Sequence, residues 1–187
     1  MLSFFPEKKE SSREPSGNPE KLSEKTPSLL KPKKVRISKV LSEDVILTAP
    51  LGLDKNGLIE LLVTRLCEKR ELSDPKMFLS KVLEREQGIS TTLDTGLSLP
   101  HARMDRIKNI VAALALVPQG IVDPKQSDLT IKVMFLFFSS SRQEMLPVHL
   151  QLLRGVSSLF QPALIEELAA AADPAAALEM IRRVETQ

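Results

Sequence analysis

Residues 110–117, IVAALALV, and residues 131–138, IKVMFLFF, are apolar at nearly every position. Strands with one face in water alternate apolar and polar residues, whereas these two segments do not alternate. Both are far shorter than the ~18–20 apolar residues that a membrane span requires. We therefore predict two central strands covered by helices on both faces, separated by Pro118-Gln119-Gly120 and the polar segment 123–128.

Helical patterns stand on both sides of these strands in the sequence. Asp54 is a typical helix start, and so is Ser73 or Asp74 followed by Pro75, because a side-chain oxygen caps the first amides and proline suits the first helical position. Predicted helices cover about residues 54–69, 73–86, 144–160, 162–168 and 174–184. A brief strand is expected at residues 45–47, with loop and short strand over residues 89–100. This order predicts an α/β fold with helices around a small mixed β-sheet.

Residues 1–36 differ in composition from the rest of the chain. They hold nine Lys/Arg against five Asp/Glu, and five of the 13 prolines. Few apolar residues are available there to offset the entropy of ordering, so we predict a disordered tail or linker, followed by one domain over residues 37–187. The cations Lys31, Lys33, Lys34 and Arg36 could form a patch for an acidic surface or lipid, although a solvated linker is the simpler interpretation.

The composition excludes several functions. A net charge of +2 does not indicate nucleic-acid binding, and a single cysteine, Cys67, forms neither an internal disulfide nor a multi-thiolate zinc site. We read Cys67 as a semi-buried helix residue. Neither a signal peptide nor a membrane span is recognisable, so we expect a cytoplasmic protein without membrane insertion. Two histidines remain for any imidazole chemistry.

The first histidine, His101, follows Pro100, which fixes the backbone at the end of a short apolar segment. Neutral imidazole is nucleophilic near pH 7 and can carry a phosphoryl group. The hydroxyls of Ser90, Thr91 and Thr92 could bind an anion, and the Arg85 guanidinium has the planar fork that suits phosphate. The alternative is a surface histidine beside a turn.

The second histidine, His149, occupies an inward position of the helix predicted over residues 144–160. A hydrogen-bonded core histidine is the alternative to a functional one. Zinc binding by the two histidines is not expected, because the spacing shows no third ligand. We predict no metal and no cofactor.

These residues, taken together, resemble a known signature. The family signature runs approximately R-E-x-x-G-S-T-G-I-G-N-G-V-A-I-P-H, and it aligns on His101 without a gap. Matching positions are Arg85-Glu86, Ser90-Thr91, Gly96 and Pro100-His101, and a later H-L-x-x-L element matches His149-Leu150 and Leu153. The chain is thereby similar, over about residues 38–185, to type 2 IIA domains of the bacterial phosphotransferase system, the fructose, mannitol and nitrogen-regulatory IIA family.

The resemblance implies a fold and a function. The fold would be a three-layer α/β/α sandwich with a mixed sheet. His101 would accept a phosphoryl group from the phosphocarrier protein HPr or a paralogue, with His149 nearby and Arg85 organising the site. The group would pass to a IIB domain in sugar transport, or its presence would govern binding to a regulated target. The chain resembles a stand-alone IIA protein, which modestly favours a role in regulation over one in sugar transport.

The glycine-rich part of the signature is altered here. Ile89, Thr92 and Asp94 stand where the family has glycine, and Asp94 adds a negative charge close to where phosphate would approach. A second hypothesis is therefore a degenerate IIA fold that binds a partner without phosphorylation. A third, a regulatory domain of a membrane transporter, rests on fold analogy alone.

Overall fold

The computed structural model describes residues 35–187. The predicted tail or linker over residues 1–36, with the cations Lys31, Lys33 and Lys34, lies outside these residues except for its last two positions. The helices are α1 (Lys55–Lys69), α2 (Pro75–Gln87), α3 (Leu146–Leu159), α4 (Pro162–Ala169) and α5 (Pro174–Glu185). The strands are β1 (Ile46–Thr48), β2 (Leu97–Ser98), β3 (His101–Met104), β4 (Val111–Asp123) and β5 (Gln126–Ser140). None of the described helices is long and apolar enough to cross a bilayer.

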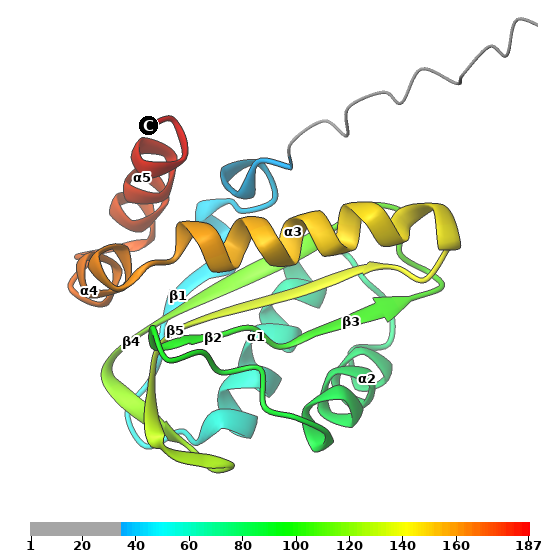
Figure 1. Cartoon of the computed structure of the whole chain (residues 1–187). Coiled ribbons are helices and arrows are strands. Elements are labelled where there is room, and N and C mark those ends of the chain that lie inside the picture. The colour runs from blue at the N-terminus through cyan, green and yellow to red at the C-terminus, as the bar shows by residue number, and fades with distance from the viewer. Residues whose placement is uncertain (1–34) are drawn as a thin grey trace, which may run out of the picture. The chain divides into compact units, whose positions relative to one another are not determined.

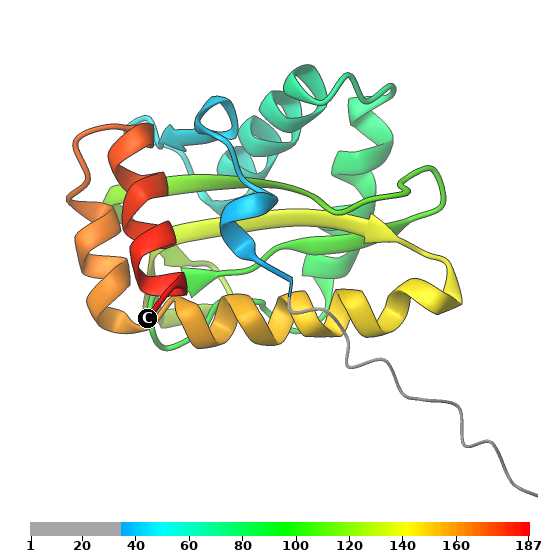
Figure 2. The same ribbon diagram turned by 90° about the horizontal axis from the view of Figure 1, so that it is seen from above.

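The five strands form one mixed sheet. β1 runs parallel to β4, β4 and β5 form an antiparallel hairpin, and β2 and β3 both lie parallel to β5. Helices α1 and α2 cover one face, and α3, α4 and α5 cover the other (Figures 1 and 2). The predicted α/β sandwich is confirmed.

Alternate residues of β5 reach opposite helical layers. Phe138 meets Phe78 of α2 edge to face, with ring centroids 4.9 Å apart. Phe135 points to the other face and meets Phe160, directly after α3, at 5.8 Å. Successive side chains of a strand point to opposite faces, so both faces of β5 need apolar residues. This explains why residues 131–138 are apolar at every position except Lys132.

The predicted helix starts are confirmed at Asp54 and Asp74. Asp54 accepts a hydrogen bond from the Gly57 amide at 2.7 Å, and Asp74 accepts one from Met77 at 3.2 Å. Each carboxylate thereby satisfies an amide that has no partner within the helix.

The predicted break at 118–120 is wrong, because β4 continues through it to Asp123. The polar segment 123–128 does contain the turn between the two strands, but the turn takes only residues 124 and 125, since β5 already begins at Gln126. Residues 117–120 of β4 stand opposite Lys132 of β5 alone, so the ladder bulges at this point. Gly120 has φ of +70°, and a Cβ atom there would lie 2.5 Å from Thr130. A bulge accommodates the proline and glycine that local sequence patterns assign to a loop.

One edge of the sheet is interrupted at Leu99-Pro100, between β2 and β3. Proline has no amide proton to donate to the ladder. Its carbonyl still accepts from the Phe137 amide at 3.2 Å, so the chain stays in register with β5. His101 therefore begins β3 directly opposite Phe137.

Candidate functional site

His101 is fixed on β3 by a stacked ring and a carbonyl group. Its imidazole lies almost parallel to the Phe137 ring, at 12° and with centroids 5.3 Å apart. Its Nδ1 atom is 2.8 Å from the carbonyl oxygen of Leu99. A carbonyl oxygen only accepts hydrogen bonds, so Nδ1 carries the proton. In the neutral ring, Nε2 then keeps its lone pair.

His149 reaches the same place from α3. Its ring centroid is 5.4 Å from that of His101 and 5.3 Å from that of Phe137, so the three rings form a nearly equilateral triangle. His149 is 5% exposed, and its Nδ1 atom lies 2.7 Å from the Ser139 hydroxyl. The two histidines, 48 residues apart in sequence, thus meet at one site.

A pocket of about 410 Å³ opens over the two imidazoles. Its lining comes from α2 (Lys81, Glu84, Arg85), β3 (His101, Ala102, Arg103) and α3 (His149). Three cationic side chains and one carboxylate surround it. This balance of charge favours an anionic group above the imidazoles.

The two arginines of the pocket are held by backbone carbonyls. Arg85 donates through Nη1 to the Ile89 carbonyl at 3.0 Å. Arg103 donates to the carbonyls of Ser140, Ser141 and Arg142 at 2.7–3.1 Å. Hydrogen bonds to fixed acceptors restrict the rotamers of both side chains, so their charges are positioned before any ligand arrives.

Both imidazoles are neutral at pH 7 in this environment. Burial lowers the pKa of His101, and the Arg85 charge lowers it further, although the Leu99 carbonyl partly opposes them. Burial, followed by the charges of His101 and Arg103, lowers the pKa of His149 to about 4. A neutral imidazole is the form that can act as a nucleophile.

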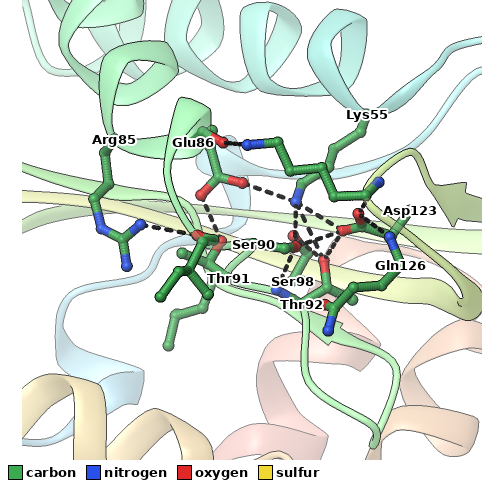
Figure 3. Close-up of polar contacts among 12 residues, drawn as sticks. Lys55, Arg85, Glu86, Ser90, Thr91, Thr92, Ser98, Asp123 and Gln126 are labelled. Carbon is green, nitrogen blue, oxygen red and sulfur yellow. Dashed lines mark hydrogen bonds and ion pairs between the residues drawn. The ribbon is translucent and has the colours of Figure 1, made fainter.

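The structure does not bring Ser90, Thr91 and Thr92 into this pocket. Thr91 donates to Glu86 at 2.6 Å, and Ser90 donates to Asp123 at 2.8 Å. Thr92 also donates to Asp123. Their hydroxyls serve a neighbouring buried cluster (Figure 3), so of the six residues proposed from sequence only His101, His149 and Arg85 share the pocket.

Lys55 is the centre of that buried cluster. Its Nζ atom lies 2.8 Å from both the Glu86 and the Asp123 carboxylates, and its side chain is 3% exposed. Burial would raise the pKa of Asp123, but Lys55, Thr92 and Ser90 donate to its carboxylate, and the net result is a pKa well below the ordinary value. The cluster ties α1, α2 and the β4–β5 turn together.

The cluster also fixes the end of α2, from which the pocket is built. Glu86 points into it, whereas the guanidinium of its neighbour Arg85 lies to one side of it and donates to the Ile89 carbonyl (Figure 3). Lys125 donates to the carbonyls of Glu86 and Gly88 at the same helix end. Anchoring of Glu86 and its carbonyl therefore sets the position of Arg85.

Sequence reasoning missed Lys55, Asp123, Arg103 and Ser139. Local patterns assigned Asp123 to a polar loop, and Lys55 is a cation in the first turn of a helix, where exposure is the usual outcome. Arg103 lies two residues after His101 and was the one residue of the four with an available signal.

Comparisons with known proteins identify the family of this chain. The family model for the phosphoenolpyruvate-dependent sugar phosphotransferase system, EIIA 2, matches residues 39–184. The PTS system fructose-specific EIIA component of Haloferax volcanii is 28% identical over 105 residues, which are 55% of this chain. That alignment spans 66% of the relative's length, just under two thirds.

Two solved structures show the same fold. The nitrogen regulatory protein IIA-Ntr from Neisseria meningitidis superimposes with a TM-score of 0.67 at 20% identity, covering 78% of this chain and 98% of that one. IIA mannitol from Escherichia coli gives a TM-score of 0.64 at 19% identity, covering 75% and 98%. With the family match over most of its length, the chain belongs to the type 2 EIIA family of the phosphoenolpyruvate-dependent sugar phosphotransferase system.

Proposed function

We propose that this protein is a histidine phosphoryl carrier and that His101 accepts the phosphoryl group on Nε2. The observation that carries the proposal is the state of the His101 ring. Its Nδ1 proton is engaged by the Leu99 carbonyl, which leaves the Nε2 lone pair as the nucleophile. The donor would be HPr or a similar phosphocarrier protein.

The transfer step requires few groups. The Nε2 lone pair of His101 attacks phosphorus, the P–N bond of the donor phosphohistidine breaks, and the donor nitrogen recovers that electron pair. The Nδ1 proton stays on its hydrogen bond to the Leu99 carbonyl. Catalysis then depends mainly on alignment and on neutralising the phosphoryl oxygens.

Arg85, Arg103 and Lys81 would supply that neutralisation, because all three line the pocket. His149 would add a hydrogen bond to a phosphoryl oxygen from the opposite side. No metal is required in this mechanism, since the charges of the side chains already face the anion.

A IIB domain or a regulated target protein would be the next partner. A complex of the mannitol IIA enzyme with phosphorylated IIB from Escherichia coli, 18% identical to this chain, supports the first. Cys67 is not a suitable onward acceptor, because burial and the nearby Asp74 raise its pKa to about 11.

Since the phosphocarrier partners work in the cytoplasm, we propose the same location for this protein. A IIA protein of this kind would act in sugar phosphotransfer or in regulation.

A second candidate is a binding module that keeps the fold without phosphorylation. It is favoured by the altered loop, where the hydroxyls of Ser90 and Thr92 are bound to Asp123 rather than free for phosphate. Ile89, which stands where the family has glycine, is strongly exposed beside Arg85.

Incubation with phosphoenolpyruvate, enzyme I and HPr separates the two. We expect a mass increase of one phosphate that is labile in acid and stable in base, which His101→Ala removes. His149→Ala should slow labelling and leave part of it, and identical kinetics would remove His149 from the site. Absence of label on the wild-type protein with a cognate HPr would contradict the carrier function.

A further inference from the structure

Ser139 brings a hydroxyl group to the rear of the histidine pair. It follows Phe137 by two residues on β5, so both side chains point to the α3 face of the sheet. Ser139 is 1% exposed, and its Oγ atom is 2.7 Å from Nδ1 of His149. This residue does not line the pocket, and its contact with His149 comes from behind.

The direction of this hydrogen bond follows from what the hydroxyl can reach. Within residues 35–187, Ser139 Oγ has one hydrogen-bond partner, the Nδ1 atom of His149. If His149 donated from Nδ1, the buried Ser139 proton would have no acceptor, which is costly. Donation by Ser139 satisfies both groups. Nδ1 of His149 is then bare, and the single ring proton lies on Nε2.

The two histidines therefore hold opposite tautomers. His101 faces a carbonyl, which can only accept, and carries its proton on Nδ1. His149 faces a hydroxyl, which donates, and carries its proton on Nε2. One ring presents a lone pair to the pocket and the other presents an N–H donor.

We propose that Ser139 is a positioning residue that sets the tautomer of His149, so that Nε2–H points to the phosphoryl group on His101. The effect on the phosphoryl group rests on the proposed carrier function. The position of the proton on His149 does not depend on phosphorylation. A His149 ring with the proton on Nδ1 would direct a second lone pair at the anionic oxygens, which would repel them.

Arg103 keeps Ser139 in place. The two residues are paired in the β3–β5 register, and the Arg103 side chain binds the next three carbonyls, of residues 140–142. The end of β5 is therefore held to β3 at the point where the hydroxyl must reach His149.

Long-range ¹H–¹⁵N correlation spectra of the unphosphorylated protein at pH 7 test the assignment. Protonated and bare ring nitrogens resonate far apart, and the chain contains two histidines, so His101→Gln assigns both rings. We expect the wild type to show Nδ1–H on His101 and Nε2–H on His149. A bare Nε2 on His149 would overturn the proposal.

Ser139→Ala should change the ring spectrum of His149 to a mixture of tautomers or to Nδ1–H, with the His101 spectrum preserved. Ser140→Ala is the matched control, because this neighbouring buried serine lies on the other face of β5 and binds the Arg142 amide. Ser139→Thr keeps a hydroxyl and should restore the wild-type spectrum. An unshifted Nε2–H signal in Ser139→Ala would show that Ser139 does not set the tautomer.

Phosphoryl transfer from HPr supplies the second measurement. Ser139→Ala should slow labelling of His101 about three- to tenfold, as expected for one weakened neutral hydrogen bond, and Ser140→Ala should leave the rate unchanged. A shifted tautomer with an unchanged rate would reject the role in positioning. If the wild type takes no label, the carrier function fails, whereas the ring spectra still decide whether Ser139 sets the tautomer.

Discussion

His101 and His149 lie with ring centroids 5.4 Å apart, and their Nδ1 atoms meet different chemical groups, a carbonyl oxygen and a hydroxyl. The Leu99 carbonyl requires a proton on the Nδ1 atom of His101, whereas the Ser139 hydroxyl can donate a hydrogen bond to an Nδ1 atom of His149 that carries no proton. The pair is therefore not symmetric, and one ring is suited to attack while the other is suited to stabilise. Substitutions around the pair and in the elements that support it test this arrangement.

Arg103→Lys should slow phosphorylation of His101 about tenfold. A lysine cannot replace the planar fork that binds three carbonyls at the end of β5, and its charge would no longer be fixed beside the pocket. The rate of label incorporation from HPr measures the effect. Arg106→Lys, an exposed residue three positions on, is the matched control, and equal rates in the two variants would contradict the prediction.

Lys55→Met should reduce the free energy of unfolding by about 3–5 kcal/mol, because it leaves the Glu86 and Asp123 carboxylates buried without their cation. Urea denaturation measures the loss. Lys76→Met changes an exposed lysine at the start of α2 and should cost less than about 0.5 kcal/mol. A Lys55 variant as stable as the Lys76 variant would show that the cluster does not hold the fold together.

The stability should fall as the pH is lowered from about 6.5 to about 4. The pKa of His149 drops from 6.5 in the unfolded chain to about 4 in the fold, and that of His101 is also lowered. In this range the unfolded chain binds protons that the folded chain does not, so acid favours unfolding. Asp123, with its lowered pKa, adds its own loss only below about pH 4.

Urea denaturation at a series of pH values tests this pH dependence. His149→Gln cannot titrate, so its stability should depend less on pH over the same range. The same slope in the wild type and in this variant would mean that His149 is not the group responsible.

Gly120→Ala should destabilise the protein by about 2–4 kcal/mol. The position has φ of +70°, and the added Cβ would lie 2.5 Å from Thr130. Gly52→Ala separates the two causes, because Gly52 has φ of +83° and a Cβ atom added there would meet nothing within 4 Å. It should cost about 1 kcal/mol through backbone strain alone. Equal melting temperatures for the two variants would exclude the steric contribution at the bulge.

Much of the fold was predictable from local patterns. Buried strands need apolar residues on both faces, which made β4 and β5 recognisable, and capping aspartates marked the first turns of α1 and α2. The length of the β4–β5 hairpin was not predictable, because a bulge tolerates Pro118 and Gly120, whose usual place is a loop.

The candidate site was predictable only in part. Resemblance to a signature selected His101, His149 and Arg85, which the structure gathers around one pocket. The hydroxyls of residues 90–92 were also expected to bind phosphate, but they face Glu86 and Asp123. Asp123 is 33 residues from Ser90 and 31 residues from Thr92 in the sequence. Local sequence patterns cannot show that a hydroxyl will bind a carboxylate so far along the chain.

The sequence by itself determined the α/β architecture, because periodicity and capping act over a few residues. It also carried the signature whose resemblance selected His101. Tertiary structure alone decided the protonation pattern of the two histidines, since the partners of their Nδ1 atoms depend on how β3, β5 and α3 pack together. The hydrogen-bonding partner of a buried ring is set by packing across the sheet, and packing is a property of the whole fold.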